Sequence, residues 1–220
     1  EPWRLTPGAG LFVRREGASL IAFRVGEAGP ETGGYRIVGA HTDSPGFRVK
    51  PRAAQTREGM AALGVAIYGG PILASFTDRD LTLAGRVWVR DDTAPEGVRP
   101  AHVHIKGPLL RLPNLAIHMN RDVNREGLKL DHQEQVPLVL AAADEALPPE
   151  ERFRGLLAER AGADPEALLA WSLAVADTQP GAFWGADGDL IADGQLDDLA
   201  CCHAALQALP DAPPAGGVAV

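Results

Sequence analysis

The fold can be predicted from the stretch YRIVGAHTDSP, residues 35–45. Its first six residues form a short β-type run of mainly apolar side chains. A polar cluster follows at once, and Pro45 disfavours helix at Ser44, so we expect a turn or an extended loop there. The stretch therefore predicts a strand that leads directly into a polar loop.

The segments near both ends of the chain extend this pattern. Residues 11–15 and 19–25 are β-type runs with a short connection between them, which predicts a hairpin. A helix is predicted over residues 198–209, with Pro210 ending it, because apolar side chains mark one face: Leu199, Cys202, Leu206 and Leu209. Residues 218–220 then begin another strand. Together these elements indicate an α/β sheet domain.

The middle of the chain has a different pattern. Short strand-like runs recur there, at residues 64–68, 85–89 and 102–105 among others. One helix is predicted to start at Asp164-Pro165, an N-cap acid followed by proline at the first helical position. Another is predicted from i, i+4, i+7 spacing: Val136, Leu140 and Ala143. This part therefore indicates a strand-rich second domain that also contains helices.

We predict an α/β domain formed by residues 1–50 and 186–220, interrupted by a β-rich insert over residues 51–185. The chain opens at Glu1 and closes with VAV, the start of a strand-like run. A natural domain seldom stops inside a core strand. We therefore expect the sequence to be a piece of a longer polypeptide.

Composition excludes several classes of protein. The 220 residues carry 21 basic and 29 acidic side chains, a net charge of −8, with no basic run for binding nucleic acid. No apolar stretch is long enough to predict a membrane span, and no signal-peptide pattern is present. The two cysteines are adjacent, which is typical of a reducing compartment and favours the cytoplasm.

His41 and Asp43 are the first candidates for a metal site. In extended backbone the side chains of residues i and i+2 lie on the same side. A neutral imidazole can bind zinc through one nitrogen while a nearby carboxylate orients the other. The alternative is a structural pair in a loop, since this short motif alone is common.

Asp197 and Asp198 precede the predicted helix, where a carboxylate usually serves as an N-cap. The functional alternative is that Asp197 bridges two metal ions, since each carboxylate oxygen can bind one ion. His118 lies in a mainly apolar run and has two interpretations as well, a core histidine or a functional one. A serine-hydrolase triad of His41, Asp43 and Ser44 is excluded, because near-consecutive residues cannot reach that geometry.

Six regions of the chain, read in order, resemble the aspartyl aminopeptidase family of dinuclear metallopeptidases. They cover nearly the whole chain: residues 41–45 with 48–51 (HTDSP, RVKP), 68–71 (YGGP), 78–81 with 83–87 (DRDL, LAGRV), 115–118 (LAIH), 177–180 (DTQP) and 196–199 (LDDL). The resemblance implies a split α/β metallopeptidase catalytic domain, interrupted by a β-rich dimerisation domain. It also favours the functional interpretation of each candidate residue.

The resemblance implies a role for each of these residues. His41 would be a metal ligand steadied by Asp43, and Asp197 would bridge two zinc ions, with cobalt or manganese as alternatives. His118 would reach the active site of a neighbouring subunit and help to hold the substrate. The family's general base and further ligands are expected after Val220. Two residues depart from the family pattern, where Gln195 and Asp198 replace an arginine and an asparagine.

The function implied is removal of N-terminal residues, preferably Asp or Glu, from peptides by a metal-activated water. A cytoplasmic homo-oligomer, a dodecamer built from dimers, is also implied, with no nucleic acid or membrane partner. Two alternatives remain open at this point. The chain could act only as an assembly module without catalysis, or it could belong to a related two-metal aminopeptidase of different specificity.

Overall fold

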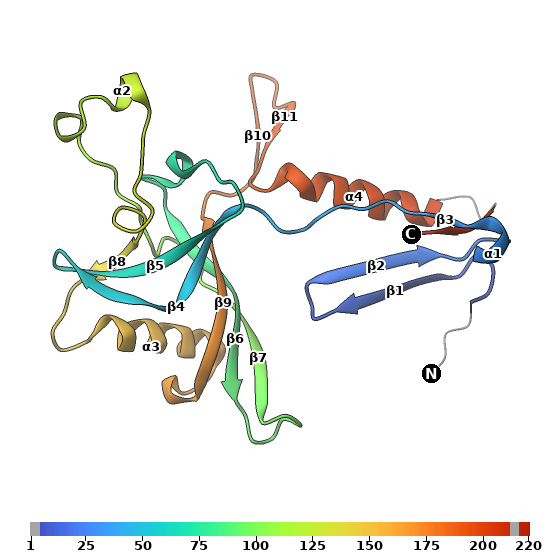
Figure 1. Ribbon diagram of the computed structural model, residues 1–220, viewed down its shortest axis with the longest axis horizontal. Coiled ribbons are helices and arrows are strands. Elements are labelled where there is room, and N and C mark those ends of the chain that lie inside the picture. Colours follow the sequence, from blue (N-terminus) through green and yellow to red (C-terminus); the bar gives the residue numbers. More distant parts are fainter. Residues whose placement is uncertain (1–4, 212–215) are drawn as a thin grey trace. The chain divides into compact units, whose positions relative to one another are not determined.

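The computed structural model describes residues 5–211 and 216–220, and the chain divides into two compact units (Figure 1). Unit 1 consists of Glu1–Ser44 and Asp193–Val220, and unit 2 of Pro45–Ala192. The predicted boundaries, after residues 50 and 185, lie inside unit 2. The reason is that a long strand already begins at Gly46 and a hairpin continues to Ala192.

Unit 1 is a small mixed α/β unit. Its four-stranded sheet has the order β1-β2-β12-β3, formed by β1 (Gly10–Arg15), β2 (Ser19–Arg24), β12 (Val218–Ala219) and β3 (Tyr35–Arg36). The predicted hairpin is confirmed as β1 and β2, and β12 lies antiparallel to β2 and parallel to β3. The short helix α1 (Pro30–Gly33) and the longer α4 (Leu196–Asp211) complete the unit.

The strand predicted over residues 35–40 is shorter than expected. Regular pairing ends at Arg36, and one further backbone hydrogen bond joins the Val38 amide to the Val220 carbonyl at 2.9 Å. The following segment, residues 39–45, forms neither helix nor strand. The expected loop at HTDSP is thus confirmed, and its conformation depends on contacts other than sheet pairing.

Unit 2 is built around an antiparallel six-stranded sheet with the order β7-β6-β9-β4-β5-β8. Its strands are β4 (Gly46–Arg57), β5 (Met60–Tyr68), β6 (Leu81–Arg90), β7 (Val98–His104), β8 (Leu138–Ala142) and β9 (Leu168–Asp177). The hairpin of β10 (Ala182–Trp184) and β11 (Leu190–Ala192) is a separate two-stranded sheet. The helical elements are η1 (Leu73–Phe76), η2 (Ile117–Met119), α2 (Val123–Glu126), α3 (Pro149–Ala161) and η3 (Pro165–Ala167).

The core of unit 2 lies between this sheet and α3, which runs beside it in Figure 1. Phe153 and Leu157 are one helical turn apart on α3 and are fully buried. The Phe153 ring packs edge-on against Trp171 of β9, with ring centroids 5.4 Å apart. Sheet side chains, including Leu63, Leu81, Leu83 and Leu173, and buried loop residues such as Leu110 and Leu112 form the rest of the core. The middle of the chain is therefore strand-rich, as the sequence predicted.

One predicted helix is wrong. Val136, Leu140 and Ala143 have helical spacing, but residues 138–142 form β8, which pairs with β5. Val136 and Leu138 are both buried, so the apolar residues also follow the period of two that is typical of a strand. The pairing with β5 decides between the two periods.

The second helix prediction for the insert is only partly right. Asp164 caps as expected, since its carboxylate accepts a hydrogen bond from the Glu166 amide at 2.9 Å. However, η3 ends at Ala167 and the chain continues as β9. Helix α3 was not predicted, although two signals mark it: Pro149 followed by acids in the first turn, and Gly162 in the left-handed region after the last turn.

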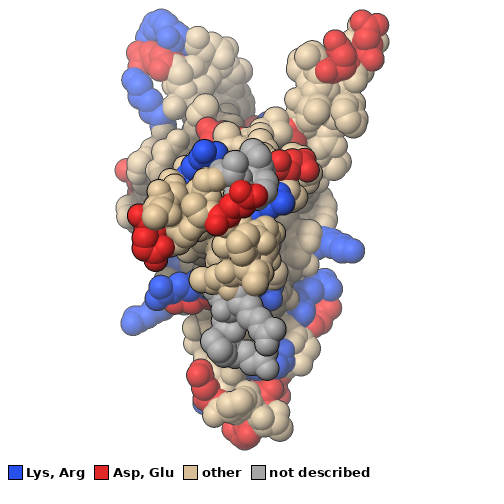
Figure 2. All heavy atoms as spheres, turned by 90° about the vertical axis from the view of Figure 1, so that its right-hand side faces the viewer, with Lys and Arg blue, Asp and Glu red and all other residues tan. Residues whose placement is uncertain are grey.

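Charges of both signs occur on the face drawn in Figure 2. In Figure 2, Lys and Arg side chains are interspersed with Asp and Glu on the face shown. None of the helices within residues 5–211 and 216–220 combines the length and apolar character needed to cross a membrane.

Gly85 offers a test of the sheet packing in unit 2. It pairs with Leu173, and an added Cβ would overlap the Ser172 carbonyl oxygen and lie 2.9 Å from the Leu173 Cα. Gly85→Ala should therefore destabilise the chain by about 1–3 kcal/mol in chemical denaturation, as overpacking does. Gly155→Ala is the control, because the space beside this α3 residue is open, and a helical glycine-to-alanine change should stabilise by about 0.5–1 kcal/mol. Equal effects of the two substitutions would contradict the packing described.

Candidate metal centre

The loop after β3 and the start of α4 meet within unit 1. The loop carries His41 and Asp43, and the first turn of α4 carries Asp197 and Asp198. Asp197 and Asp198 have non-helical backbone angles, so the regular part of the helix begins after them. The peptide bond between them is cis. Gln195, just before, has a positive φ of 67°. This turn places both carboxylates next to the His41 ring.

The imidazole of His41 is fixed by its own loop. Its Nδ1 lies 2.9 Å from the Asp43 main-chain carbonyl oxygen and 3.4 Å from the Asp43 carboxylate. Because a carbonyl oxygen only accepts, Nδ1 carries the hydrogen and donates it. The pKa of His41 is raised, first by this hydrogen bond and further by the nearby carboxylates, while partial desolvation opposes the shift. In the neutral ring, Nε2 is therefore left with the lone pair.

Nε2 faces two carboxylates. It lies 3.9 Å from Oδ1 of Asp197 and 3.7 Å from Oδ2 of Asp198. The Asp197 side chain is 97% exposed, whereas that of Asp198 is only 16% exposed. Asp198 also accepts a hydrogen bond from the His41 amide at 3.0 Å. Its pKa is held below the ordinary value, first by a hydrogen bond from the Cys201 thiol and then by the His41 amide.

The distances allow His41 and Asp197 to bind a single metal ion. Two ligands that each lie about 2.0–2.2 Å from zinc can be no more than about 4.4 Å apart, and Nε2 and Oδ1 are within that limit. No group of three or more His, Cys, Asp or Glu side chains suited to a metal is found among residues 5–211 and 216–220. The described residues therefore offer the beginning of a metal site and too few ligands to complete one.

The structure places the remaining candidate, His118, in unit 2. It lies in η2, and it is exposed, as are its neighbours Leu115, Ile117 and Met119, which are 52%, 53% and 66% exposed. The interpretation of His118 as a buried core residue is therefore wrong. His118 belongs to unit 2, whereas the group around His41 belongs to unit 1.

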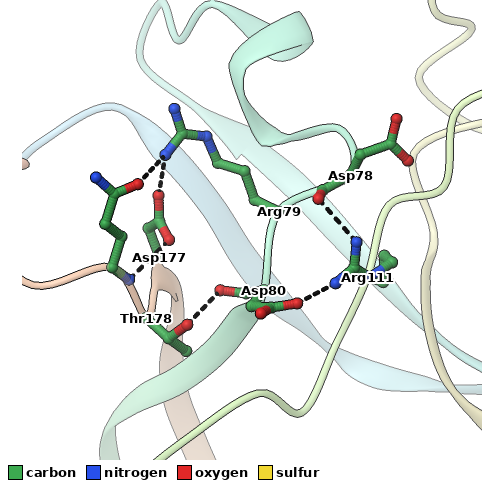
Figure 3. A pocket seen from close by; sticks show the side chains of 7 residues that line it. Asp78, Arg79, Asp80, Arg111, Asp177 and Thr178 are labelled. Carbon is green, nitrogen blue, oxygen red and sulfur yellow. Dashed lines mark hydrogen bonds and ion pairs between the residues drawn. The ribbon is translucent and has the colours of Figure 1, made fainter.

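A second polar cluster, which the sequence analysis did not predict as a site, lines a crevice in unit 2 (Figure 3). Arg111 binds the Asp80 carboxylate and donates to the Asp78 carbonyl oxygen at 2.7 Å. Arg79 binds the Asp177 carboxylate and approaches Gln179. These contacts tie the start of β6 to the end of β9, and each of the two arginines already has a carboxylate partner. The cluster is therefore explained as a structural connection.

Comparison with known proteins decides the family. Residues 1–214 match the family model described as aminopeptidase I zinc metalloprotease (M18). The chain belongs to the M18 family of aminopeptidases. The resemblance seen in the sequence is thereby confirmed at the level of this family, and the mixed α/β architecture agrees with it.

Relatives of this M18 chain are found in both sequence and structure. A probable M18 family aminopeptidase 2 from Pseudomonas savastanoi pv. phaseolicola is 43% identical over 211 residues, which cover 95% of this chain and 48% of that protein. The solved structure of Chaetomium thermophilum mApe1 is 32% identical with a TM-score of 0.83, covering 98% of this chain and 51% of that one. The Ape4 and Nbr1 complex gives 29% identity and a TM-score of 0.86, covering 98% and 45%. The M18 chain thus spans about half the length of these relatives.

One fold relative is described as a dodecamer. It is the mApe1 of S. cerevisiae, which is 24% identical with a TM-score of 0.74 and covers 97% of this chain and 48% of that one. The family is one of zinc metalloproteases, so zinc is the metal that the M18 site implies. The imidazole nitrogen and carboxylate oxygens around His41 are donors that zinc accepts, so these residues fit it.

Proposed function

We propose that this chain supplies part of the zinc site of an aminopeptidase that removes N-terminal residues from peptides. The observation that carries the proposal is the 3.9 Å separation between His41 Nε2 and Asp197 Oδ1, in a chain of the M18 family. Because the chain spans about half of its relatives, the activity belongs to the full-length protein that contains it. The cytoplasm is the proposed location.

His41 and Asp197 have different proposed roles at the metal. His41 offers Nε2 to the metal, and the hydrogen bond from Nδ1 to Asp43 keeps the ring in that tautomer and orientation. Asp197 presents an exposed carboxylate whose two oxygens can each face one ion of a pair. Bound zinc would supply Lewis acidity, polarising the scissile carbonyl and lowering the pKa of a water molecule. Cobalt or manganese could replace zinc with the same oxygen and nitrogen donors.

His118 is proposed to act in a neighbouring subunit of a homo-oligomer. Its exposure on η2, among exposed apolar side chains, is what a residue at a subunit interface requires. An imidazole there can donate a hydrogen bond to the substrate carbonyl oxygen as negative charge develops. The proposed assembly is a dodecamer of dimers, by analogy with the dodecameric relative.

The proposed substrates are peptides that begin with Asp or Glu, and the support for this preference is the resemblance to aspartyl aminopeptidases. The zinc-loaded full-length protein should hydrolyse Asp- and Glu-initiated peptides with a kcat/KM at least about tenfold above that for Leu- or Ala-initiated peptides, equivalent to about 1.4 kcal/mol. Competition between matched peptides, followed by mass spectrometry, measures the ratio. A preference for apolar N-termini would instead support a related aminopeptidase of different specificity.

A second candidate function is that of an assembly module. It is favoured by the shortage of metal ligands among residues 5–211 and 216–220. The two functions differ in one outcome. If the full-length protein assembles but binds no zinc and hydrolyses none of these peptides, the assembly role is correct and the aminopeptidase proposal fails.

A further inference from the structure

His41 lies in a segment that no sheet holds in place. Residues 39–45 form neither helix nor strand, yet a metal ligand must be held within about 0.5 Å of its productive position. The Nδ1 hydrogen bond to Asp43 fixes the ring relative to its own loop only. Contacts from outside the loop must therefore fix the loop relative to Asp197.

Helix α4 provides these contacts. The Asp198 carboxylate accepts the His41 main-chain amide hydrogen at 3.0 Å. One turn later, the Cys202 thiol donates to the His41 main-chain carbonyl oxygen, with a sulfur-to-oxygen distance of 3.2 Å. Asp198 lies just before the regular part of α4 and Cys202 lies within its first turns, so the start of this helix binds both polar groups of the His41 backbone.

The burial pattern of α4 agrees with this arrangement. Along the helix, the less exposed positions recur at helical spacing: Asp198, Cys202, Ala205 and Leu209. An acid on the packed face of a helix requires a partner, because an unpaired carboxylate loses solvation there. The Asp198 side chain, 16% exposed, has two such partners, the Cys201 thiol and the His41 amide.

We propose that Asp198 and Cys202 are positioning residues, forming a two-point backbone clamp that holds His41 so that Nε2 faces Asp197. The inference rests on the proposed function, since it concerns how the proposed zinc ligand is placed. The Asp198 oxygen that accepts the amide hydrogen is the same Oδ2 that lies 3.7 Å from Nε2. The geometry therefore assigns Asp198 to the backbone of His41, and the exposed Asp197 to the metal.

The clamp can be tested with variants that keep or remove each hydrogen-bonding atom. Asp198→Asn keeps an acceptor oxygen and Cys202→Ser keeps a donor, whereas Asp198→Ala and Cys202→Ala remove them. In the full-length protein, Asp198→Ala should weaken zinc binding about 10–100-fold, the usual effect of losing a group that orients a ligand. Asp198→Asn should stay within about threefold of wild type, and Cys202→Ser should bind zinc more tightly than Cys202→Ala. Zinc affinity is measured by competition with a chromophoric chelator.

A second measurement does not depend on zinc. Hydrogen exchange at the His41 amide of the metal-free protein should be slow in wild type and in Asp198→Asn, and faster in Asp198→Ala. Asp193→Ala, at an exposed acid before α4, is the matched control and should change neither measurement. The exchange result also distinguishes failure of the clamp from failure of the proposed function. A protein that binds no zinc but protects the His41 amide would refute the proposed function and would still agree with the clamp.

Three results would overturn the clamp. One is an Asp198→Ala protein that binds zinc as wild type does, and another is unchanged exchange at the His41 amide. The third is equal loss in the Asn and Ala variants, which would mean that the charge of Asp198, and not its acceptor oxygen, matters. If Asp198→Ala does not fold, the pair Cys202→Ser and Cys202→Ala decides, and equal zinc affinities of these two would contradict the proposal.

Discussion

Replacing Asp197 by Asn in the full-length protein is expected to lower kcat/KM by at least about 10³-fold and to reduce the bound zinc. The carboxylate is 97% exposed and its Oδ1 lies 3.9 Å from His41 Nε2, so its function, and not its packing, should account for the loss. An amide has one acceptor oxygen and no charge, and it cannot bridge two cations as a carboxylate does. Peptide hydrolysis and elemental analysis of the purified variant measure both effects.

Asp193→Asn is the control for this substitution. Asp193 is an exposed acid four residues earlier in the same unit, so it tests the loss of one surface charge. Its variant should retain wild-type activity and zinc content. An Asp197→Asn protein with normal activity and two bound zinc ions would show that Asp197 is not a ligand.

His118→Gln should lower kcat about 10²–10³-fold, the effect of removing one hydrogen-bond donor to a developing negative charge. Folding, zinc content and oligomer size should not change, because His118 is exposed on η2 and lies in a different unit from His41. His102→Gln replaces another exposed histidine of unit 2 and should leave kcat unchanged. Steady-state kinetics and size-exclusion chromatography measure these outcomes.

Mixing variants tests whether His118 acts across subunits. When His118→Gln and His41→Ala proteins exchange subunits in equal amounts, half of the dimers contain one site with both residues intact, which should restore about a quarter of wild-type activity. Mixtures without subunit exchange should stay inactive. No recovery in a mixture with demonstrated exchange would exclude a shared site.

The loop at His41 could be predicted from the sequence because its causes are local. Pro45 disfavours helix at Ser44, and the β-type run before the loop marks the preceding strand. Asp43 was predicted to lie beside the His41 ring from the i, i+2 spacing, and its carboxylate is found 3.4 Å from Nδ1. The shorter contact, from Nδ1 to the Asp43 carbonyl at 2.9 Å, could not be predicted, because it depends on the backbone conformation of an irregular loop.

The contacts of Asp198 and Cys202 with His41 join residues more than 150 positions apart in the sequence. No local pattern carries such information. The predicted apolar face of α4 included Leu199 and Leu206, yet these are 39% and 48% exposed and Asp198 lies on the packed face. The error has a physical cause, because hydrogen bonds from the Cys201 thiol and the His41 amide compensate the burial of this carboxylate.

The helix predicted from Val136, Leu140 and Ala143 failed for a different reason. Within this short segment, positions 136 and 140 have helical spacing, and positions 136, 138 and 140 have the spacing of a strand. Only the pairing with the partner strand β5 decides between the two. Helix α3 was missed even though its signals are local, since Pro149 and the acids that follow it are typical of a helix start.

The position of zinc in the full-length protein tests the central claim most directly. Anomalous scattering measured at the zinc absorption edge, from crystals of the zinc-loaded protein, locates the ion without reference to activity. We expect a peak about 2.0–2.1 Å from His41 Nε2 and about 2.0–2.2 Å from a carboxylate oxygen of Asp197. A zinc peak that contacts neither residue, or one bound through His41 Nδ1, would contradict the account.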